Sequence, residues 1–206
     1  MTKSLSARQV LEIRREKISP GGEWAGCLGD IDRHCVVFVW GNSGNGKTSA
    51  VVSLCRELTA FGKVLYLSLE EGYSLSLQNT LRRFNMAECG PRFQLLESCT
   101  LDELDERLSR PRSPEFIVVD SFQYMHLSYR QYSAFRDRHR NKMLIFVSHA
   151  DGKRPAGRAA RSVEYDAGLK IWVEGHVAFS KGRFIGETGK AVIWAKGAEK
   201  YWGKEE

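Results

Sequence analysis

The 206-residue sequence contains no long hydrophobic run. Its longest purely apolar stretches have about five residues, as at 36–40, whereas a membrane-spanning helix needs about 20. We therefore predict no membrane span. Residues 1–17 carry scattered charges and have no apolar core segment, which excludes a standard secretory signal. We expect a cytoplasmic protein.

The chain has no paired cysteine motif, no internal repeat and no low-complexity linker. The five cysteines are widely scattered and form no CxxC pair, so a zinc ribbon is not expected. Reduced thiols with a structural role are the simplest interpretation. We predict one core domain at residues 24–202, preceded by a helix and linker at 1–23 and followed by a loose tail at 203–206.

Positive charge is concentrated in the second half of the chain. Residues 1–103 carry equal numbers of basic and acidic groups, whereas residues 121–161 carry nine basic and two acidic groups, a net charge of +7. We call residues 121–161 the basic segment. Clustering of this kind can mark contact with a polyanion such as DNA, and the alternative is a solvated basic face.

Apolar runs alternate with amphipathic stretches along the chain. Five predominantly apolar runs are typical of buried parallel strands, and they lie at 36–40, 64–69, 116–120, 143–148 and 170–174. Helices are predicted at 6–17, 47–60, 74–84, 101–108 and 129–140. Thr100 is a candidate N-cap and Gly62 a candidate C-cap. A short strand is expected at 93–97, and residues 176–180 and 191–194 are expected to form an antiparallel pair. The pattern predicts an α/β fold with a mostly parallel central sheet flanked by helices and a C-terminal antiparallel hairpin.

The sequence between the first predicted strand and the next helix is GxxxxGK[ST], the phosphate-loop motif. Glycines let the backbone N–H groups turn inward around phosphate oxygens, and the helix N-terminus adds its positive dipole end. The lysine is expected to reach the β- and γ-phosphates, and the threonine hydroxyl to bind Mg²⁺. With the serine that follows, the candidate nucleotide-binding residues are Gly41, Asn42, Ser43, Gly44, Asn45, Gly46, Lys47, Thr48 and Ser49.

Carboxylates follow two other predicted strands, where such sheets bind ligands. Asp120 comes directly after residues 116–119 and is a candidate to bind the nucleotide and hold Mg²⁺, unless it caps the next turn. Glu70 or Glu71 could orient and deprotonate the water that attacks the γ-phosphate. Because neighbouring strand residues point to opposite faces, we expect only one of the two to face the nucleotide. The alternative is a solvated strand end.

A polar pair, Ser148 and His149, ends the strand that follows Asp120. Either side chain could contact the γ-phosphate and report its loss. A lone histidine is more often structural, so the interpretation depends on the neighbouring motifs.

In this order and spacing, GNSGNGKT, LYLSLEEG, FIVVDS and IFVSHA resemble the RecA-like ATPase core of RadA/Sms recombination proteins and DnaB-type helicases. The resemblance covers residues 24–195 and aligns Glu70 with the catalytic glutamate of that group. Residues 180–184 resemble its Lys-x-Arg segment, whose two basic side chains reach the γ-phosphate of a neighbouring subunit. It therefore implies catalytic roles for Lys47, Glu70, Lys181 and Arg183, with ATP and Mg²⁺ as cofactors and a ring or filament of copies. A basic hairpin tip is the alternative for Lys181 and Arg183.

In RecA-like proteins the loops after the aspartate strand and after the next strand touch DNA. Here these loops are residues 121–142 and 150–166, so the resemblance implies DNA binding without sequence preference. Residues 151–158 have no evident apolar anchor and are expected to be mobile. Aromatic side chains in the first loop could stack on bases, although core packing explains them equally; they are Phe122, Tyr124, Tyr129, Tyr132 and Phe135.

The chain departs from those relatives in having no N-terminal zinc module, protease-like domain or helicase N-terminal domain. We therefore expect a partner protein. Two other functions stay open: a nucleotide-switched interaction module of the KaiC kind, without DNA binding, and a small-molecule kinase on a phosphate-loop scaffold. The motif alone does not distinguish ATP from GTP.

Overall fold

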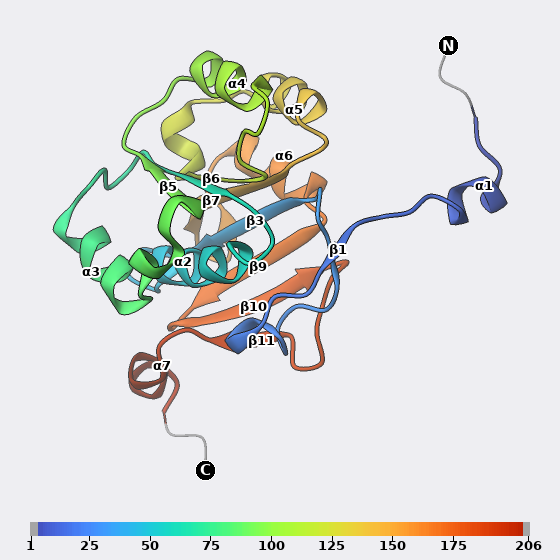
Figure 1. Cartoon of the computed structure of the whole chain (residues 1–206). Coiled ribbons are helices and arrows are strands. Elements are labelled where there is room, and N and C mark those ends of the chain that lie inside the picture. The colour runs from blue at the N-terminus through green and yellow to red at the C-terminus, as the bar shows by residue number, and fades with distance from the viewer. Residues whose placement is uncertain (1–3, 204–206) are drawn as a thin grey trace.

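Parallel strands form the centre of the sheet in the computed structural model, which describes residues 4–203 (Figure 1). They are β3 (Val36–Gly41), β4 (Val64–Ser68), β5 (Phe93–Leu96), β6 (Phe116–Asp120), β7 (Met143–Asp151) and β9 (Leu169–Glu174). The strand order is β11-β10-β9-β3-β7-β6-β4-β5. All five of the predicted apolar runs and the short strand at 93–97 are found in this sheet.

Antiparallel strands complete the sheet at one edge. β10 (Val177–Gly182) pairs with β9 and with β11 (Lys190–Val192), and β8 (Arg154–Pro155) pairs with the end of β7. A separate two-stranded sheet joins β1 (Lys17–Ile18) to β2 (Ile31–Asp32). The predicted fold class, including the C-terminal hairpin, is confirmed.

Helices cover both faces of the sheet (Figure 1). Successive side chains in a strand point to opposite faces, so β3 buries Val37 and Val39 against α2 (Lys47–Leu58) and buries Phe38 and Trp40 on the other side. The second face is covered by α4 (Leu101–Ser109), α5 (Tyr129–Arg138) and α6 (Arg158–Asp166). We call these the α2 face and the α5 face. α3 (Leu75–Arg83) packs beside α2.

Helix ends follow the predicted signals in part. Thr100 caps α4, and its hydroxyl accepts from the Glu103 N–H while the Glu103 side chain returns to the Thr100 N–H. Gly62 is not a helix cap, because α2 ends at Leu58 with Thr59 as its C-cap. The chain needs no left-handed residue there.

The predicted N-terminal helix is much shorter than expected. Only α1 (Ala7–Leu11) is helical, and residues 4–17 are all exposed. Figure 1 shows α1 projecting away from the sheet. Within residues 4–203, the apolar side chains of Val10, Leu11 and Ile13 stay exposed and no other element covers them, which explains why the helix is not extended.

Several elements were not predicted. They are β1, β2, β8, α6, α7 (Ala195–Trp202), and the short 3₁₀ helices η1 (Gly22–Trp24), η2 (Met86–Arg92) and η3 (Phe122–Met125). The expectation that residues 151–158 lack an anchor and are mobile is wrong, because β8 pairs with β7 there, Pro155 is buried and α6 begins at Arg158. No helix within residues 4–203 is long and apolar enough to cross a membrane. Residues 1–3 and 204–206, including most of the predicted tail, lie outside the described part.

Candidate nucleotide-binding site

Four strands of the parallel sheet end beside the phosphate loop. Gly41 at the end of β3 is level with His149 of β7, and Ser68 at the end of β4 is level with Asp120 at the end of β6. This carboxyl edge is where parallel sheets bind ligands. The predicted residues therefore come from separate parts of the chain to one place.

Glycines shape the loop between β3 and α2. Gly44 has φ of 76° and Gly46 has φ of 91°, in the left-handed region that favours glycine. A side chain at Gly41 would collide with the Val173 carbonyl of β9. Gly46 is the N-cap of α2, so the helix dipole points its positive end into the loop.

Lys47 lies folded back over this loop. Its Nζ donates to the Asn42 carbonyl at 3.2 Å. Burial lowers the pKa of Lys47, although the negative charges of Asp120, Glu70 and Glu71 oppose that shift. The lysine thus sits between a carbonyl that holds it in place and carboxylates that favour its charged form.

Asp120 is buried on the α2 face, because it continues the alternation set by Phe116 and Val118. Its Oδ2 accepts a short hydrogen bond from the Tyr66 hydroxyl. Burial raises the pKa of Asp120 to about 6; the Tyr66 hydrogen bond opposes this shift, and the charges of Glu70 and Glu71 reinforce it. The site therefore holds a carboxylate whose charge is incompletely compensated.

Glu70 faces His149 across the ends of β4 and β7. The Glu70 Oε2 lies 2.8 Å from the His149 Nε2, and the same nitrogen lies 3.3 Å from the Ser121 Oγ. Both side chains remain partly exposed, at 35% for Glu70 and 41% for His149. A carboxylate and an imidazole are thus held together where solvent and a ligand can reach them.

Glu71 also faces the loop. Its Oε1 accepts from the Thr48 hydroxyl at 3.4 Å, and its Oε2 accepts from the Ser74 hydroxyl at 3.2 Å. The expectation that only one glutamate would face the site is wrong, because β4 ends at Ser68 and both residues follow in a turn. Strand alternation does not separate them.

Ser148 and His149 are separated by alternation as expected for strand residues. His149 points to the α2 face, and Ser148 points to the α5 face, where it is fully buried. The Gln123 Nε2 donates to the Ser148 Oγ at 2.8 Å, and the His149 N–H donates to the Gln123 Oε1 at 3.4 Å. Ser148 is therefore structural here, and Gln123 holds the strand end in place.

The phosphate loop is tied to two neighbouring turns. On one side the Asn42 Nδ2 donates to the Gly152 carbonyl in the β7–β8 turn at 3.2 Å. On the other, the Gly175 N–H donates to the Asn45 Oδ1 at 2.8 Å, and the His176 N–H donates to the Asn45 carbonyl at 3.1 Å. Ser43 and Gly44, between these anchors, are exposed.

Lys181 and Arg183 do not meet the phosphate loop of their own chain. β10 runs antiparallel to β9, so Gly182 is level with Leu169 at the amino end of the sheet. Lys181 lies on the α5 face, with its Nζ 5.9 Å from the centre of the Trp40 ring. Both basic side chains are exposed.

The basic segment divides into two halves. Three arginines of the first half are paired with carboxylates: Arg136 with Asp166 at 2.5 Å, Arg138 with Asp105 at 2.9 Å and Arg140 with Asp137 at 3.0 Å. Lys142 is buried and donates to the Ser113 hydroxyl and the Pro114 carbonyl. In the second half Lys153, Arg154, Arg158 and Arg161 are all exposed. The charge available at the surface is therefore concentrated after residue 150.

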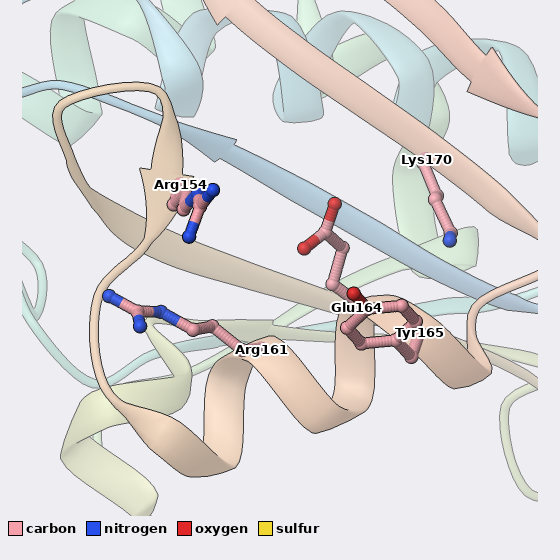
Figure 2. Close-up of a pocket in the computed structure, with 5 residues that line it drawn as sticks. All are labelled: Arg154, Arg161, Glu164, Tyr165 and Lys170. Atoms are coloured by element: carbon pink, nitrogen blue, oxygen red, sulfur yellow. The ribbon is translucent and has the colours of Figure 1, made fainter.

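Some of these basic side chains line a hollow of about 320 Å³. Figure 2 shows Arg154 from β8 and Arg161 from α6 at one end, Lys170 from β9 at the other, and Glu164 between them. The Lys170 Nζ lies 5.7 Å from the centre of the Tyr165 ring. Tyr165 itself is 81% exposed, so the hollow offers both cations and an accessible aromatic face.

The aromatic residues of the first half mostly pack in the core. Phe122, Tyr132 and Phe135 are buried on the α5 face, whereas Tyr124 and Tyr129 are exposed. For the three buried rings, core packing is therefore the correct interpretation. Tyr165, which was not considered, is the more accessible ring.

Three residues at the site were missed from the sequence. Tyr66 is a tyrosine inside a continuous apolar strand, and a buried hydroxyl needs a partner, which was a usable signal. Gln123 lies in the short 3₁₀ helix η3 and His176 in the β9–β10 turn, and only the folded chain shows what they contact.

Comparison with known proteins gives one informative similarity. Over 101 residues the chain is 25% identical to the DNA repair and recombination protein RadB of Methanosphaera stadtmanae. The aligned part is 45% of this chain and 44% of that protein, so it spans less than half of the relative's length. The sequence matches no family model.

Proposed function

We propose that the chain is a Mg²⁺-dependent ATPase of the RecA-like class that acts on DNA, in recombination, repair or replication, as an assembly of copies. The observation that carries the proposal is the convergence of Lys47, Asp120 and the Glu70–His149 pair at the phosphate loop. The similarity to a DNA repair and recombination protein supports the same class. A cytoplasmic location and a further protein partner remain predictions from the sequence.

The residues at the loop fit a magnesium–nucleotide complex. Thr48 offers a hydroxyl and Asp120 a carboxylate, and Mg²⁺ is commonly bound by one or two such oxygens together with phosphates and water. Within residues 4–203 there is no group of three or more histidine, cysteine or acidic residues that could hold a metal. Bound Mg²⁺ would neutralise charge on the phosphates and on Asp120.

In this proposal Glu70 is the general base. Its carboxylate orients the attacking water and accepts its proton, and Lys47 stabilises charge on the β- and γ-phosphates. His149 contacts Glu70 directly, so it can sense whether the γ-phosphate is present. Lys181 and Arg183 are placed away from their own loop, which supports a role at the site of a second copy.

DNA binding is proposed for the second half of the basic segment. Exposed arginines neutralise phosphates, and an exposed aromatic ring can stack on an unpaired base. Arg154, Arg161, Lys170 and Tyr165 bring both chemistries to one hollow (Figure 2). The exposed apolar side chains of α1 support association with another protein surface.

The test is steady-state ATP hydrolysis at low salt, with and without single-stranded DNA, alongside direct ATP binding. We expect Lys47→Ala to lose hydrolysis and Glu70→Gln to lose it about 100-fold or more while ATP still binds. Glu71→Gln is the matched control and should lose much less. Arg183→Ala should lose hydrolysis but regain part of it when mixed with Lys47→Ala, because each variant supplies what the other lacks.

Each result bears on a separate part of the proposal. Loss of hydrolysis in Glu71→Gln but not in Glu70→Gln would reassign the base. Full activity in a strictly monomeric Arg183→Ala variant would remove the role in a second copy. ATP binding with no response to DNA would favour the nucleotide-switched interaction module instead.

A further inference from the structure

An exposed cluster of rings and one guanidinium lies beside the phosphate loop. Trp194, the N-cap of α7, is 44% exposed. Its ring centre lies 4.8 Å from that of His176 in an edge-on arrangement, and the guanidinium of Arg83 lies over it at 5.8 Å. We call Arg83, His176 and Trp194 the ring cluster; its members come from α3, the β9–β10 turn and α7.

The ring cluster is attached to one side of the loop. A side chain at Gly46 would come within 2.9 Å of the His176 Nδ1, and the His176 N–H donates to the Asn45 carbonyl. Arg83 reaches the same side, where its Nη1 donates to the Ser49 Oγ at 3.4 Å. The cluster therefore borders residues 45–49 directly.

The position of the catalytic candidates indicates which part of a nucleotide this side would meet. Glu70 and His149 belong to the strand ends on the side of the loop that Asn42 faces. A γ-phosphate placed for attack by water must lie toward Glu70. The ribose and base then leave the loop on the other side, where Asn45, Ser49 and the ring cluster lie.

We propose that Arg83 and Trp194 form the platform on which the nucleobase stacks, with His176 as the brace that fixes the Trp194 ring against the loop. This inference rests on the proposed nucleotide binding and adds the part of the site that holds the base. The Arg83 guanidinium carbon lies 5.8 Å from the centre of the Trp194 ring, and the Arg83 and Trp194 side chains are both exposed, so a flat ligand can reach them. Planar guanidinium groups and aromatic rings both stack on bases.

The backbone of the β9–β10 turn fixes the position of the His176 ring. Gly175 and His176 form the two-residue turn between β9 and β10, with φ of 52° and 61°. Both residues of a type I′ turn have positive φ, and here the turn points the His176 ring at Trp194. Burial, reinforced by the charge of Arg83, lowers the pKa of His176 and so favours the neutral form of the ring that packs against Trp194.

Stacking recognises a flat ring rather than a pattern of donors and acceptors. Such contacts are worth about 1–3 kcal/mol per base and tolerate different bases. The platform should therefore favour purines over pyrimidines through their larger ring area and should separate adenine from guanine weakly. Its contribution is to affinity, and none of its atoms is placed to act on the γ-phosphate.

The test compares ATP with inorganic tripolyphosphate, which has the phosphates but no base. Dissociation constants of both are measured for the wild type, Arg83→Ala, Arg83→Lys and Trp194→Ala. We expect ATP binding to weaken about tenfold in Arg83→Ala and Trp194→Ala, with tripolyphosphate binding unchanged within twofold. Arg83→Lys should resemble Arg83→Ala, because it keeps the charge and loses the plane. Arg82→Ala is the matched control and should bind both ligands normally, since Arg82 bonds to Asn79 and Gln78 of its own helix.

The outcomes separate this inference from the function on which it rests. If the wild type binds neither ligand, nucleotide binding itself is refuted. If the wild type binds ATP and the variants bind it equally well, only the platform is refuted. Equal weakening of ATP and tripolyphosphate would also overturn the platform, because the residues would then be holding the phosphate loop. Arg83 is exposed, so its variants test the inference even if Trp194→Ala fails to fold.

Discussion

Charged side chains cluster both at the carboxyl edge of the sheet and in the first half of the basic segment. The charges at the edge are incompletely compensated, whereas those of the basic segment's first half are paired. At the edge, Asp120, Glu70 and Glu71 lie near one another with Lys47 as the nearby cation. On α5 and just after it, each arginine–carboxylate contact is close and direct. Charges left incompletely compensated indicate a place where a ligand completes the balance, and charges paired within the fold indicate structure.

The second half of the basic segment resembles the carboxyl edge, because its charges are also left incompletely compensated within the fold. Arg161 lies 4.0 Å from Asp151, which is 82% exposed, so that contact is a weak ion pair. A net charge of +7 over 41 residues is therefore a poor guide by itself. What matters is which of the basic residues contact an acidic residue from elsewhere in the chain.

The largest expected effect tests the uncompensated charge at the edge. Folding raises the pKa of Asp120 from 3.8 to about 6, so the folded state binds its proton more tightly than the unfolded state. The free energy of unfolding therefore falls as pH rises from about 4 to about 6 and stays lowered above that range. We expect Asp120→Asn, without nucleotide, to be more stable than the wild type by about 2 kcal/mol at pH 8.

Thermal unfolding measures this difference. The gain corresponds to about 4–8 °C in Tm for a chain of this size, and it should vanish below about pH 3, where the wild-type carboxyl is protonated in both states. Asp151→Asn, at an exposed position, should show no change at either pH. An Asp120→Asn variant no more stable than the wild type at pH 8 would mean that the charge is already compensated.

A smaller effect is expected for DNA binding, and it separates the two halves of the basic segment. We expect Arg154→Ala combined with Arg161→Ala to weaken binding to single-stranded DNA about tenfold at low salt. The slope of log affinity against log salt should fall by about 1.4, because two phosphate contacts are lost. Fluorescence anisotropy over a salt series measures both quantities.

The control for that experiment carries the same change of charge. Arg138→Ala combined with Arg140→Ala also removes two arginines of the basic segment, but these are paired with Asp105 and Asp137. We expect its affinity to stay within about twofold of the wild type. Equal losses in the two double variants would show that only total charge matters.

A further effect, of about the same size, concerns the acidic partners. The Asp105 Oδ1 lies 2.7 Å from the Nε2 of His139, which is 4% exposed, and 2.9 Å from the Nε of Arg138. Asp105→Ala leaves a buried imidazole without that partner and should cost about 1–2 kcal/mol in stability. Asp151→Ala should cost less than about 0.5 kcal/mol. Urea unfolding of the two variants measures the difference in stability. Similar values for both would contradict the distinction between paired and weakly paired carboxylates.

Much of the fold could be predicted because its signals are local. Strand runs such as 116–119 are apolar throughout, and the phosphate loop is eight consecutive residues with a fixed spacing. α6 was missed although Ala160, Val163 and Ala167 have helical spacing, because small side chains and many arginines hid the apolar stripe. The helix at 6–17 was overpredicted, because its periodicity does not show whether another surface covers it.

The candidate site shows the same difference between local and long-range signals. Strand alternation alone explains why Asp120 and His149 face α2 while Ser148 does not. The positions of Glu70 and Glu71 depend on where β4 ends, and that end is set by a turn rather than by a propensity of either residue. The pairing of the first half of the basic segment depends on Asp105 and Asp166, which are distant in sequence from their arginines.

The β9–β10 turn has a structural consequence. One end of the β10 hairpin is bonded to Asn45 of the phosphate loop, and its other end leads into Arg183. A strand of six residues spans about 20 Å, so β10 is a short, direct connection between the phosphate loop and Arg183. A single strand therefore connects the phosphate loop to Arg183, the residue that we propose acts at the site of a second copy.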